Sequence, residues 1–371
     1  MMKQAGNGRM SNGMNMSMKD LVEKLAAEHS LSEEEYARLI DGRTGETASA
    51  LAEEARKVRE SVYGKDVYVR GLIEISNICK NDCLYCGIRR SNRNCSRYRL
   101  TAEEIFECAA EGHRLGFRTF VLQGGEDAYY TDDLLSDLIR SLKTSFPDSA
   151  VTLSLGERGR ESFRKLYAAG ADRYLLRHET ADPMHYRYLH PSEMSFENRL
   201  QCLRDLKEIG FQTGCGFMVG SPGQTTGALA KDLKWIEEFR PEMCGIGPFV
   251  PHRDTPFGKE PTGSVELTVF LLSVIRLIHP KVLLPATTAL GTVQRDGREQ
   301  GMLAGANVVM PNLTPRSVRG KYELYDNKLS SGEEAAEGLK KLAESMDAVG
   351  YRLAMVRGDA ADMQHEKQSR S

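Results

Sequence analysis

Three closely spaced cysteines are the residues of this chain best suited to chemistry. Cys79, Cys83 and Cys86 form a C-x3-C-x2-C pattern that directly follows an apolar run. Three thiolates at this spacing can hold three corners of a 4Fe–4S cube. The fourth iron is then left without a protein ligand, so a reactant can bind there. The spacing therefore predicts an enzyme rather than an electron store.

Zinc is the alternative occupant of this loop. Structural zinc sites use four ligands, usually as two close pairs, and Cys95 could supply the fourth ligand. However, C-x3-C is an awkward zinc spacing, and Tyr85, just before the last cysteine, has no role in a zinc site. We favour the cluster, and a zinc-braced barrel without catalysis is the alternative from a different class.

The elements that position this loop alternate regularly. Each strand-like run is followed by a helix-like run, which demands parallel pairing because each helix returns the chain to the same edge. Eight such units have the size of a closed (β/α)8 barrel. An open doubly wound sheet would more often carry a glycine-rich turn after its first strand, where this chain has cysteines. The expected strands are 67–75, 119–123, 150–155, 173–176, 213–219, 244–250, 282–286 and 307–310.

The α/β barrel is expected to fill most of the chain. We predict a disordered arm at 1–17, a helical extension at 18–66, the barrel at 67–351 and a tail at 352–371, with the last helix at about 332–349. The net charge of −2 does not favour nucleic acid as a partner, and no apolar run approaches the roughly 20 residues of a membrane span. Eight cysteines without an export signal indicate reduced thiols and a cytoplasmic protein.

Function in such barrels gathers at the carboxyl ends of the strands. By strand alternation, Arg177 and Glu179 should share a face with Arg173, and charges directed into a barrel are costly unless they bind something. The alternative is a mutual salt bridge that caps the rim. Thr287 and Thr288 end the seventh strand and could bind an anion or a polar substrate, although β-branched residues are also common in strands.

The cysteine spacing, together with Tyr85, resembles the signature of the radical S-adenosylmethionine (SAM) superfamily. The resemblance implies that Cys79, Cys83 and Cys86 hold one 4Fe–4S cluster and that SAM chelates its fourth iron. It also implies a set of residues that bind SAM, namely Tyr85, Gly124, Gly125, Glu126, Glu179, Arg199, Met218 and Tyr322. The substrate residues implied in the same way are Gln123, Arg177, Thr287, Thr288 and Tyr325.

Longer stretches between about Val67 and Gly350 resemble one branch of that superfamily, the HydE-type maturases of iron–iron hydrogenases. The resemblance implies reductive cleavage of SAM to a 5′-deoxyadenosyl radical during assembly of the di-iron subcluster of the H-cluster. The implied substrate is a small iron–carbonyl–cyanide–cysteine complex, and the implied partners are an electron donor and other maturases. No cysteine follows Cys244, so a single cluster is expected. The stretches are 83–90, 97–101, 125–127, 152–157, 170–180, 195–199, 218–220, 222–225, 245–249, 285–288 and 305–308.

Two other radical SAM activities are alternatives. A methylornithine synthase should pair the ammonium group of an amino acid with more inward carboxylates. A biotin-synthase-like sulfur inserter needs a sacrificial second cluster built from several inward cysteines, whereas only Cys215 and Cys244 of the remaining cysteines fall on expected strands. Both alternatives share the cluster and SAM with the maturase, so they differ from it only in the substrate.

Overall fold

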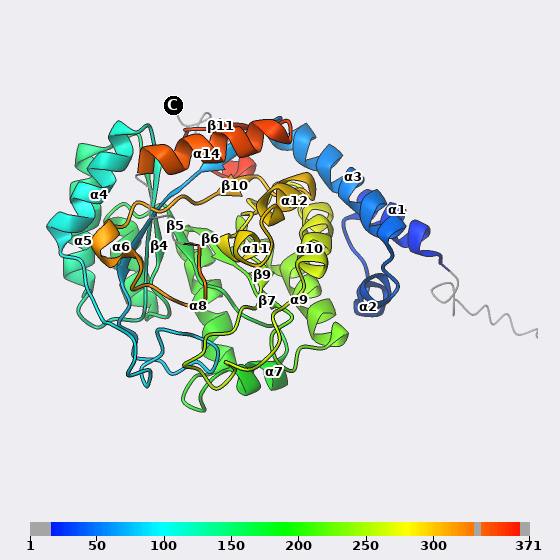
Figure 1. Ribbon diagram of the computed structural model, residues 1–371, viewed down its shortest axis with the longest axis horizontal. Coiled ribbons are helices and arrows are strands. Elements are labelled where there is room, and N and C mark those ends of the chain that lie inside the picture. Colours follow the sequence, from blue (N-terminus) through cyan, green and yellow to red (C-terminus); the bar gives the residue numbers. More distant parts are fainter. Residues whose placement is uncertain (1–15, 330–334, 364–371) are drawn as a thin grey trace, which may run out of the picture.

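A parallel β-sheet forms the centre of the molecule (Figure 1). The structure, a computed structural model, describes residues 16–329 and 335–363. Six strands lie side by side in chain order, and every pairing between them is parallel, as the alternation of strands and helices predicts. They are β2 (Gly71–Ser76), β3 (Thr119–Gly124), β4 (Ala150–Ser154), β5 (Arg173–Leu175), β6 (Gln212–Cys215) and β8 (Met243–Cys244).

Short segments close this sheet into a barrel. The expected seventh strand, 282–286, contributes only bridging residues, because Pro285 has no N–H to donate to a longer ladder. The eighth strand contains β10 (Val308–Val309) and continues to a bridge with β2. The closed (β/α)8 fold predicted from the sequence is therefore confirmed. The closing bridges are Met243–Leu283, Pro285–Val308 and Leu72–Asn312.

Helices cover the outside of the barrel (Figure 1). Ser, Thr or Asp side chains accept a hydrogen bond from the first turn of most of them, and Thr101 forms a capping box with Glu104. Their inward faces carry the apolar side chains of the main hydrophobic core. The helices are α4 (Ala102–Arg114), α5 (Asp132–Ser145), α6 (Arg160–Ala168), α7 (Pro183–Leu189), α8 (Phe196–Ile209), α9 (Thr226–Phe239), α10 (Val265–Ile278), α11 (Thr288–Val293), α12 (Gly297–Leu303), α13 (Arg316–Arg319) and α14 (Ala335–Ala348).

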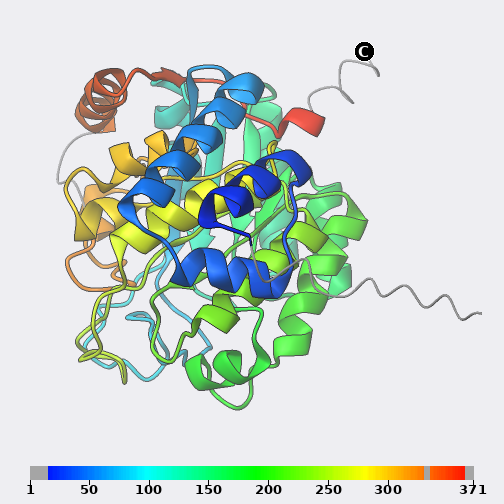
Figure 2. The same ribbon diagram turned by 90° about the vertical axis from the view of Figure 1, so that its right-hand side faces the viewer.

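The N-terminal extension packs against one side of the barrel (Figure 2). It consists of α1 (Met18–Glu28), α2 (Glu33–Asp41) and α3 (Gly45–Tyr63), close to the predicted spans. α3 lies on α10, and α2 lies on α9. Ser17, which the sequence analysis placed in the arm, caps α1 with a capping box, whereas residues 1–15 lie outside the described residues.

The C-terminal segment departs from the expected tail. β11 (Arg352–Ala354) pairs in parallel with β1 (Asp66–Val69), so the sheet continues beyond the expected boundary at residue 351. Residues 355–363 then follow the same end of the barrel, and residues 364–371 lie outside the described range. The start of the expected last helix, 332–334, also lies outside it.

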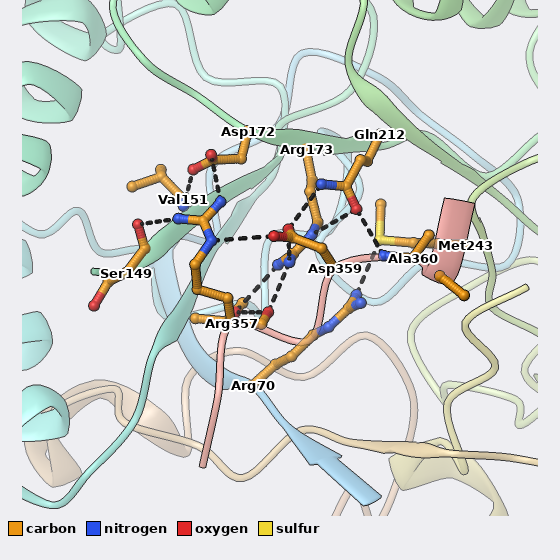
Figure 3. A network of polar contacts seen from close by, with 12 residues as sticks. Arg70, Ser149, Val151, Asp172, Arg173, Gln212, Met243, Arg357, Asp359 and Ala360 are labelled. Carbon is orange, nitrogen blue, oxygen red and sulfur yellow. Dashed lines mark hydrogen bonds and ion pairs between the residues drawn. The ribbon is translucent and has the colours of Figure 1, made fainter. Parts of the chain in front are cut away.

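A buried ionic network holds this segment to the base of the barrel (Figure 3). Asp359 Oδ1 accepts hydrogen bonds from Arg173 Nη2 at 2.6 Å and from Gln212 Nε2 at 2.8 Å. Arg357 Nη2 donates to Asp172 Oδ1 at 2.8 Å. Because Arg173 begins β5 and Gln212 begins β6, the network lies at the amino ends of the strands, opposite the end where the cysteines follow β2. In the described part of the chain, no helix is both long and apolar enough to cross a membrane.

Candidate active site

The cysteine loop follows β2 and is held by the turn after β3. Glu126 N donates to Cys79 Sγ at 3.4 Å, and Lys80 N donates to the Glu126 carbonyl oxygen at 3.0 Å. A Cβ on Gly125 would lie 2.2 Å from the Ile78 carbonyl oxygen, so only glycine allows the two loops to approach this closely. Gly125 therefore has a structural reason to be glycine, besides its expected contact with SAM.

The cysteine thiols lie in surroundings that disfavour their charged form. Burial raises the pKa of Cys86 to about 12, and the neighbouring Cys79 adds to the shift. Burial, with the neighbouring Cys86, also raises the pKa of Cys83 well above its usual value. Bound iron cations would lower these thiol pKa values, because a metal-bound thiol loses its proton. The thiols are thus suited to a cluster.

A cluster and a single ion differ in the ligand geometry that they require. Within residues 16–329 and 335–363, no three His, Cys, Asp or Glu side chains converge as the ligands of one ion do. A cube spreads its cysteine ligands over different irons, so its thiolates do not meet at one point. Cys95 Sγ accepts a hydrogen bond from Asn77 Nδ2 at 3.5 Å.

Arg177 and Glu179 face each other after β5. Their closest side-chain atoms, Arg177 Nη2 and Glu179 Oε2, are 3.2 Å apart, which is the mutual ion pair that the sequence analysis weighed as an alternative. The two side chains point together as strand alternation predicted, although β5 ends at Leu175 and Glu179 has a φ of 66°. Arg173, which was expected beside them, lies at the base of the barrel with Asp359.

This pair keeps unused hydrogen-bonding capacity. Arg177 Nε and Nη2, Glu179 Oε2 and Thr287 Oγ1 are buried and have no hydrogen-bond partner in the described part of the chain. Buried polar atoms normally have partners, so such atoms mark a place for a ligand. Thr287 faces β9 (Gly247–Pro248), since a Cβ on Gly247 would lie 2.7 Å from its hydroxyl.

Arg199 is fixed by a partner that the sequence analysis did not assign to the site. Arg199 Nε lies 2.5 Å from Glu157 Oε1, and its Nη1 donates to the Arg177 carbonyl oxygen at 2.6 Å. Glu157 N in turn donates to Glu126 Oε1 at 2.9 Å. Glu157 lies shortly after β4, which ends at Ser154, so its position near a strand end was the available signal. This series of contacts links the ends of β3, β4 and β5 through charged side chains.

The aromatic residue of the cysteine loop is oriented by a buried histidine. Tyr85 Oη lies 3.1 Å from His190 Nε2, while His190 Nδ1 lies 2.9 Å from the Tyr186 carbonyl oxygen. Burial lowers the pKa of His190 to about 3, so the ring is neutral at pH 7 and Nε2 accepts from the tyrosine. Tyr85 also packs against a small apolar cluster that contains Met218.

Two further predicted residues, Gln123 and Tyr322, belong to a cluster of polar side chains inside the barrel. Gln123 Nε2 lies 3.4 Å from Tyr322 Oη. Glu74, a buried residue of β2 that sequence reasoning missed, forms an ion pair with Lys328 and accepts from Asn312 Nδ2 at 2.9 Å. Glu74 interrupts an otherwise apolar run, and this interruption was the signal in the sequence that could have identified it.

Three predicted residues play different parts in the structure. Thr288 begins α11 and lines a cavity of about 230 Å³, which Asn312 and Lys328 also line. Burial raises the pKa of Tyr325 to about 12. Gly124 ends β3, and a Cβ there would lie 3.3 Å from Ile75 Cγ1. Thr287 is the N-cap of α11 and Thr288 is its first residue, so both lie at the start of this helix.

Comparison with known proteins defines the class to which this barrel and its cysteine loop belong. The Radical SAM superfamily matches residues 73–236. The [FeFe] hydrogenase maturase subunit HydE of Thermotoga maritima is 44% identical over 339 residues, which are 91% of this chain and 96% of that protein. The chain therefore belongs to the HydE-type maturase family of the radical SAM superfamily.

Other relatives share the fold more distantly. The 3-methylornithine synthase of Methanosarcina acetivorans is 29% identical over 334 residues, 90% of this chain and 93% of that protein. The crystal structure of methylornithine synthase (PylB) matches with a TM-score of 0.80 at 27% identity, over 93% of this chain and 99% of that one. The hydrogenase maturase HydG of Carboxydothermus hydrogenoformans shares the fold, with a TM-score of 0.76 at 21% identity over 91% of this chain and 79% of that one.

Family membership defines the cofactors. The protein is a radical SAM enzyme that uses a 4Fe–4S cluster and SAM. The cluster supplies one electron that breaks the sulfonium–carbon bond of SAM. The three half-buried cysteines, the Arg177–Glu179 pair and Arg177 Nε, which has no hydrogen-bond partner in the described residues, fit such an anionic cluster and the zwitterionic amino-acid end of SAM.

Proposed function

We propose that this protein acts in the assembly of the di-iron subcluster of the [FeFe] hydrogenase H-cluster, as its resemblance to the HydE-type maturases implies. Its Thermotoga relative is an [FeFe] hydrogenase maturase subunit. The observation that carries the proposal is the guanidinium of Arg177, which pairs with Glu179 but has a buried Nε without a hydrogen-bond partner in the described residues, in a barrel whose cysteine loop can hold an open cluster. The substrate is a small anionic iron–carbonyl–cyanide–cysteine complex. An external electron donor and other maturases are the proposed partners, and the reaction runs in the cytoplasm, where thiols stay reduced.

The residues divide between two ligands. Cys79, Cys83 and Cys86 hold a single cluster, and Arg199 binds the SAM carboxylate while Glu179 accepts from an ammonium or a ribose hydroxyl. The remaining SAM contacts are proposed for Tyr85, Gly124, Gly125, Glu126, Met218 and Tyr322. The substrate contacts are proposed for Gln123, Arg177, Thr287, Thr288 and Tyr325.

Methylornithine formation is the second candidate, because a 3-methylornithine synthase shares 29% identity and the same barrel. Such an enzyme should offer inward carboxylates to an ammonium group. The inward carboxylates described here, Glu74 and Glu179, already face Lys328 and Arg177. Once this ion pair is counted, Arg177 Nε is still a buried donor without a partner in the described residues, which favours an anionic substrate.

The test is genetic and chemical. The reconstituted protein with dithionite should release 5′-deoxyadenosine from SAM, and deletion in a host that makes the hydrogenase should abolish hydrogenase activity. Restoration by the wild-type chain but not by Arg177→Leu would support the proposed role of Arg177. Hydrogenase activity that survives deletion would reject the maturase function, and 3-methylornithine as the product would establish the alternative.

A further inference from the structure

A buried histidine lies between the two charged residues after β5. Arg177 and Glu179 form their ion pair, whereas the intervening His178 is fully buried against α9. His178 Nε2 lies 3.1 Å from Asp232 Oδ1 of α9, and its ring centroid lies 4.4 Å from that of Trp235. The segment is therefore attached to the helix layer outside the barrel at the residue between its two charges.

The attachment continues on both sides of Glu179. Asp232 Oδ1 also accepts from Ala181 N at 2.5 Å, and Glu179 N donates to the Gly216 carbonyl oxygen at 3.0 Å. Gly216 N donates to His178 Nδ1 at 3.3 Å, which assigns the ring proton to Nε2 and makes Asp232 its acceptor. One carboxylate oxygen thus holds the residue before Glu179 and the residue two positions after it.

Glu179 needs such support. Its φ of 66° is left-handed, a conformation that residues with a side chain adopt at a cost. Strained residues of this kind persist only where their surroundings hold them. Without its anchors, Glu179 would relax to an ordinary conformation, and its carboxylate would turn away from Arg177.

The anchor itself is expensive, which argues that more than packing selects it. Asp232 has no exposed surface, and its Oδ2 has no hydrogen-bond partner among residues 16–329 and 335–363. Burial raises the pKa of its carboxyl, although the hydrogen bond from His178 opposes the shift. An apolar side chain would fill this space without that desolvation cost.

We propose that Asp232 is the positioning residue of the SAM site, which it serves by holding Glu179 in its left-handed conformation through His178 and the Ala181 amide. Asp232 touches no reacting group and acts only through the 177–181 segment. The inference rests on the ligand role proposed for Glu179, and it adds a residue of the outer helix layer to the machinery of the barrel mouth.

The test compares four variants of the full chain with its cluster reconstituted. Asp232→Leu removes both hydrogen bonds, whereas Asp232→Asn retains the oxygen that accepts them. Glu179→Ala removes the proposed ligand itself. Tyr36→Phe is the matched control, because it removes a different hydrogen bond to α9, from Tyr36 Oη to Glu237 at 2.8 Å.

Two quantities are measured on each variant: the dissociation constant of SAM by equilibrium dialysis and the hydrogen exchange of residues 177–181. We expect Asp232→Leu to weaken SAM binding about tenfold or more and to speed exchange of the segment, with iron content unchanged. Asp232→Asn should restore both to within about twofold. Tyr36→Phe should lower the melting temperature without altering SAM affinity.

The outcomes separate this inference from the proposed function. Wild-type SAM affinity in Asp232→Leu, alongside weak binding in Glu179→Ala, overturns the positioning role. If Glu179→Ala binds SAM normally, the ligand assignment is wrong, and unchanged exchange of the segment in Asp232→Leu then overturns the anchor as well. Should Asp232→Leu not fold, His178→Phe removes the same link from the loop side and must reproduce its effects.

Discussion

At the scale of single residues, the candidate site contains buried polar atoms that have no hydrogen-bond partner in the described part of the chain, and so does the base, at Arg70 Nε and Nη2. Arg177 Nε and Thr287 Oγ1 are buried without a hydrogen-bond partner in the described residues, and each such atom costs about 1–3 kcal/mol. Arg173, which has no exposed surface, instead pairs with Asp359 at the base. A ligand that forms hydrogen bonds with these atoms at the mouth of the barrel would offset this free-energy cost.

Removing one cluster cysteine tests the metal assignment. Cys86→Ala should lose the iron and the visible absorption of the reconstituted protein, because two thiolates cannot hold the cube. The buried thiol of Cys202 on α8 serves as the control, and Cys202→Ala should keep the full iron content. Iron analysis and absorption spectra check both. A fully loaded Cys86→Ala protein would contradict the assignment of this loop.

Glu157 should matter through Arg199. Their side chains are 15% and 8% exposed, so Glu157→Ala leaves a buried guanidinium without its carboxylate and should lower the free energy of unfolding by about 3 kcal/mol. Denaturant titration of the protein measures this. Asp137→Ala, which breaks an exposed ion pair with Arg140, should change stability by less than about 1 kcal/mol. Equal effects of the two changes would refute a special role for Glu157.

At the scale of elements, the ends of strands decide where charges point. β5 stops at Leu175, and the next pairing of this segment is a single bridge between Glu179 and Phe217. The three residues between them leave the strand, which allows His178 to reach α9 while its two neighbours face each other. Residues 177 and 179 share one side and residue 178 takes the other, as in a strand, although this segment lies beyond the end of β5.

Substitution of Glu179 separates its backbone from its side chain. Glu179→Gly and Glu179→Ala both remove the carboxylate, but only glycine adopts a φ of 66° without strain. We therefore expect the glycine variant to be more stable than the alanine variant by about 1 kcal/mol, with both defective in SAM binding. Thermal and denaturant unfolding measure the difference in stability between the two variants. An alanine variant at least as stable as the glycine variant would show that the conformation is not strained.

At the scale of the whole molecule, the two ends of the barrel are built differently. The base is closed by the segment 355–363 and its buried ionic network (Figure 3), whereas the mouth carries the cysteine loop and the Arg177–Glu179 pair. In Figure 1, β11 lies at the upper edge and α7 at the lower edge, so the two ends are far apart. Chemistry is therefore confined to one end of a rigid scaffold.

The network at the base predicts a dependence of stability on pH. Burial alone would raise the pKa of Asp359, but Arg173 and Arg357 outweigh it and hold the pKa well below its usual range. A depressed folded pKa means that the stabilisation is present above about pH 4 and is lost as the pH falls below it. Asp359→Asn should cost about 3 kcal/mol at neutral pH, since it leaves Arg173 buried beside a neutral group.

The expected difference between Asp359→Asn and the wild type is constant from about pH 6 to 8 and narrows in acid, because the wild-type carboxyl then becomes protonated as well. Urea unfolding at several pH values measures it. The exposed Asp347 of α14 provides the control, and Asp347→Asn should leave the pH profile unchanged. A difference that widens in acid would contradict the sign of the effect.

The sequence by itself determined much of this protein. The C-x3-C-x2-C spacing predicted the chemistry, because a cluster needs its thiolates close together in the chain, and local spacing survives without knowledge of the fold. The alternation of strands and helices predicted the barrel, since periodicity is a local property. Glycine at position 125 and the caps at Ser32 and Thr101 could also be read locally.

Only the tertiary structure decided which polar residues meet. The link from Glu157 to Arg199 spans 42 residues, that from His178 to Asp232 spans 54, and that from Arg173 to Asp359 spans 186. Such pairs depend on how the strand ends are arranged around the barrel, which no local pattern records. For the same reason, the residues after 351 were read as a tail, although their partners lie at the starts of β5 and β6.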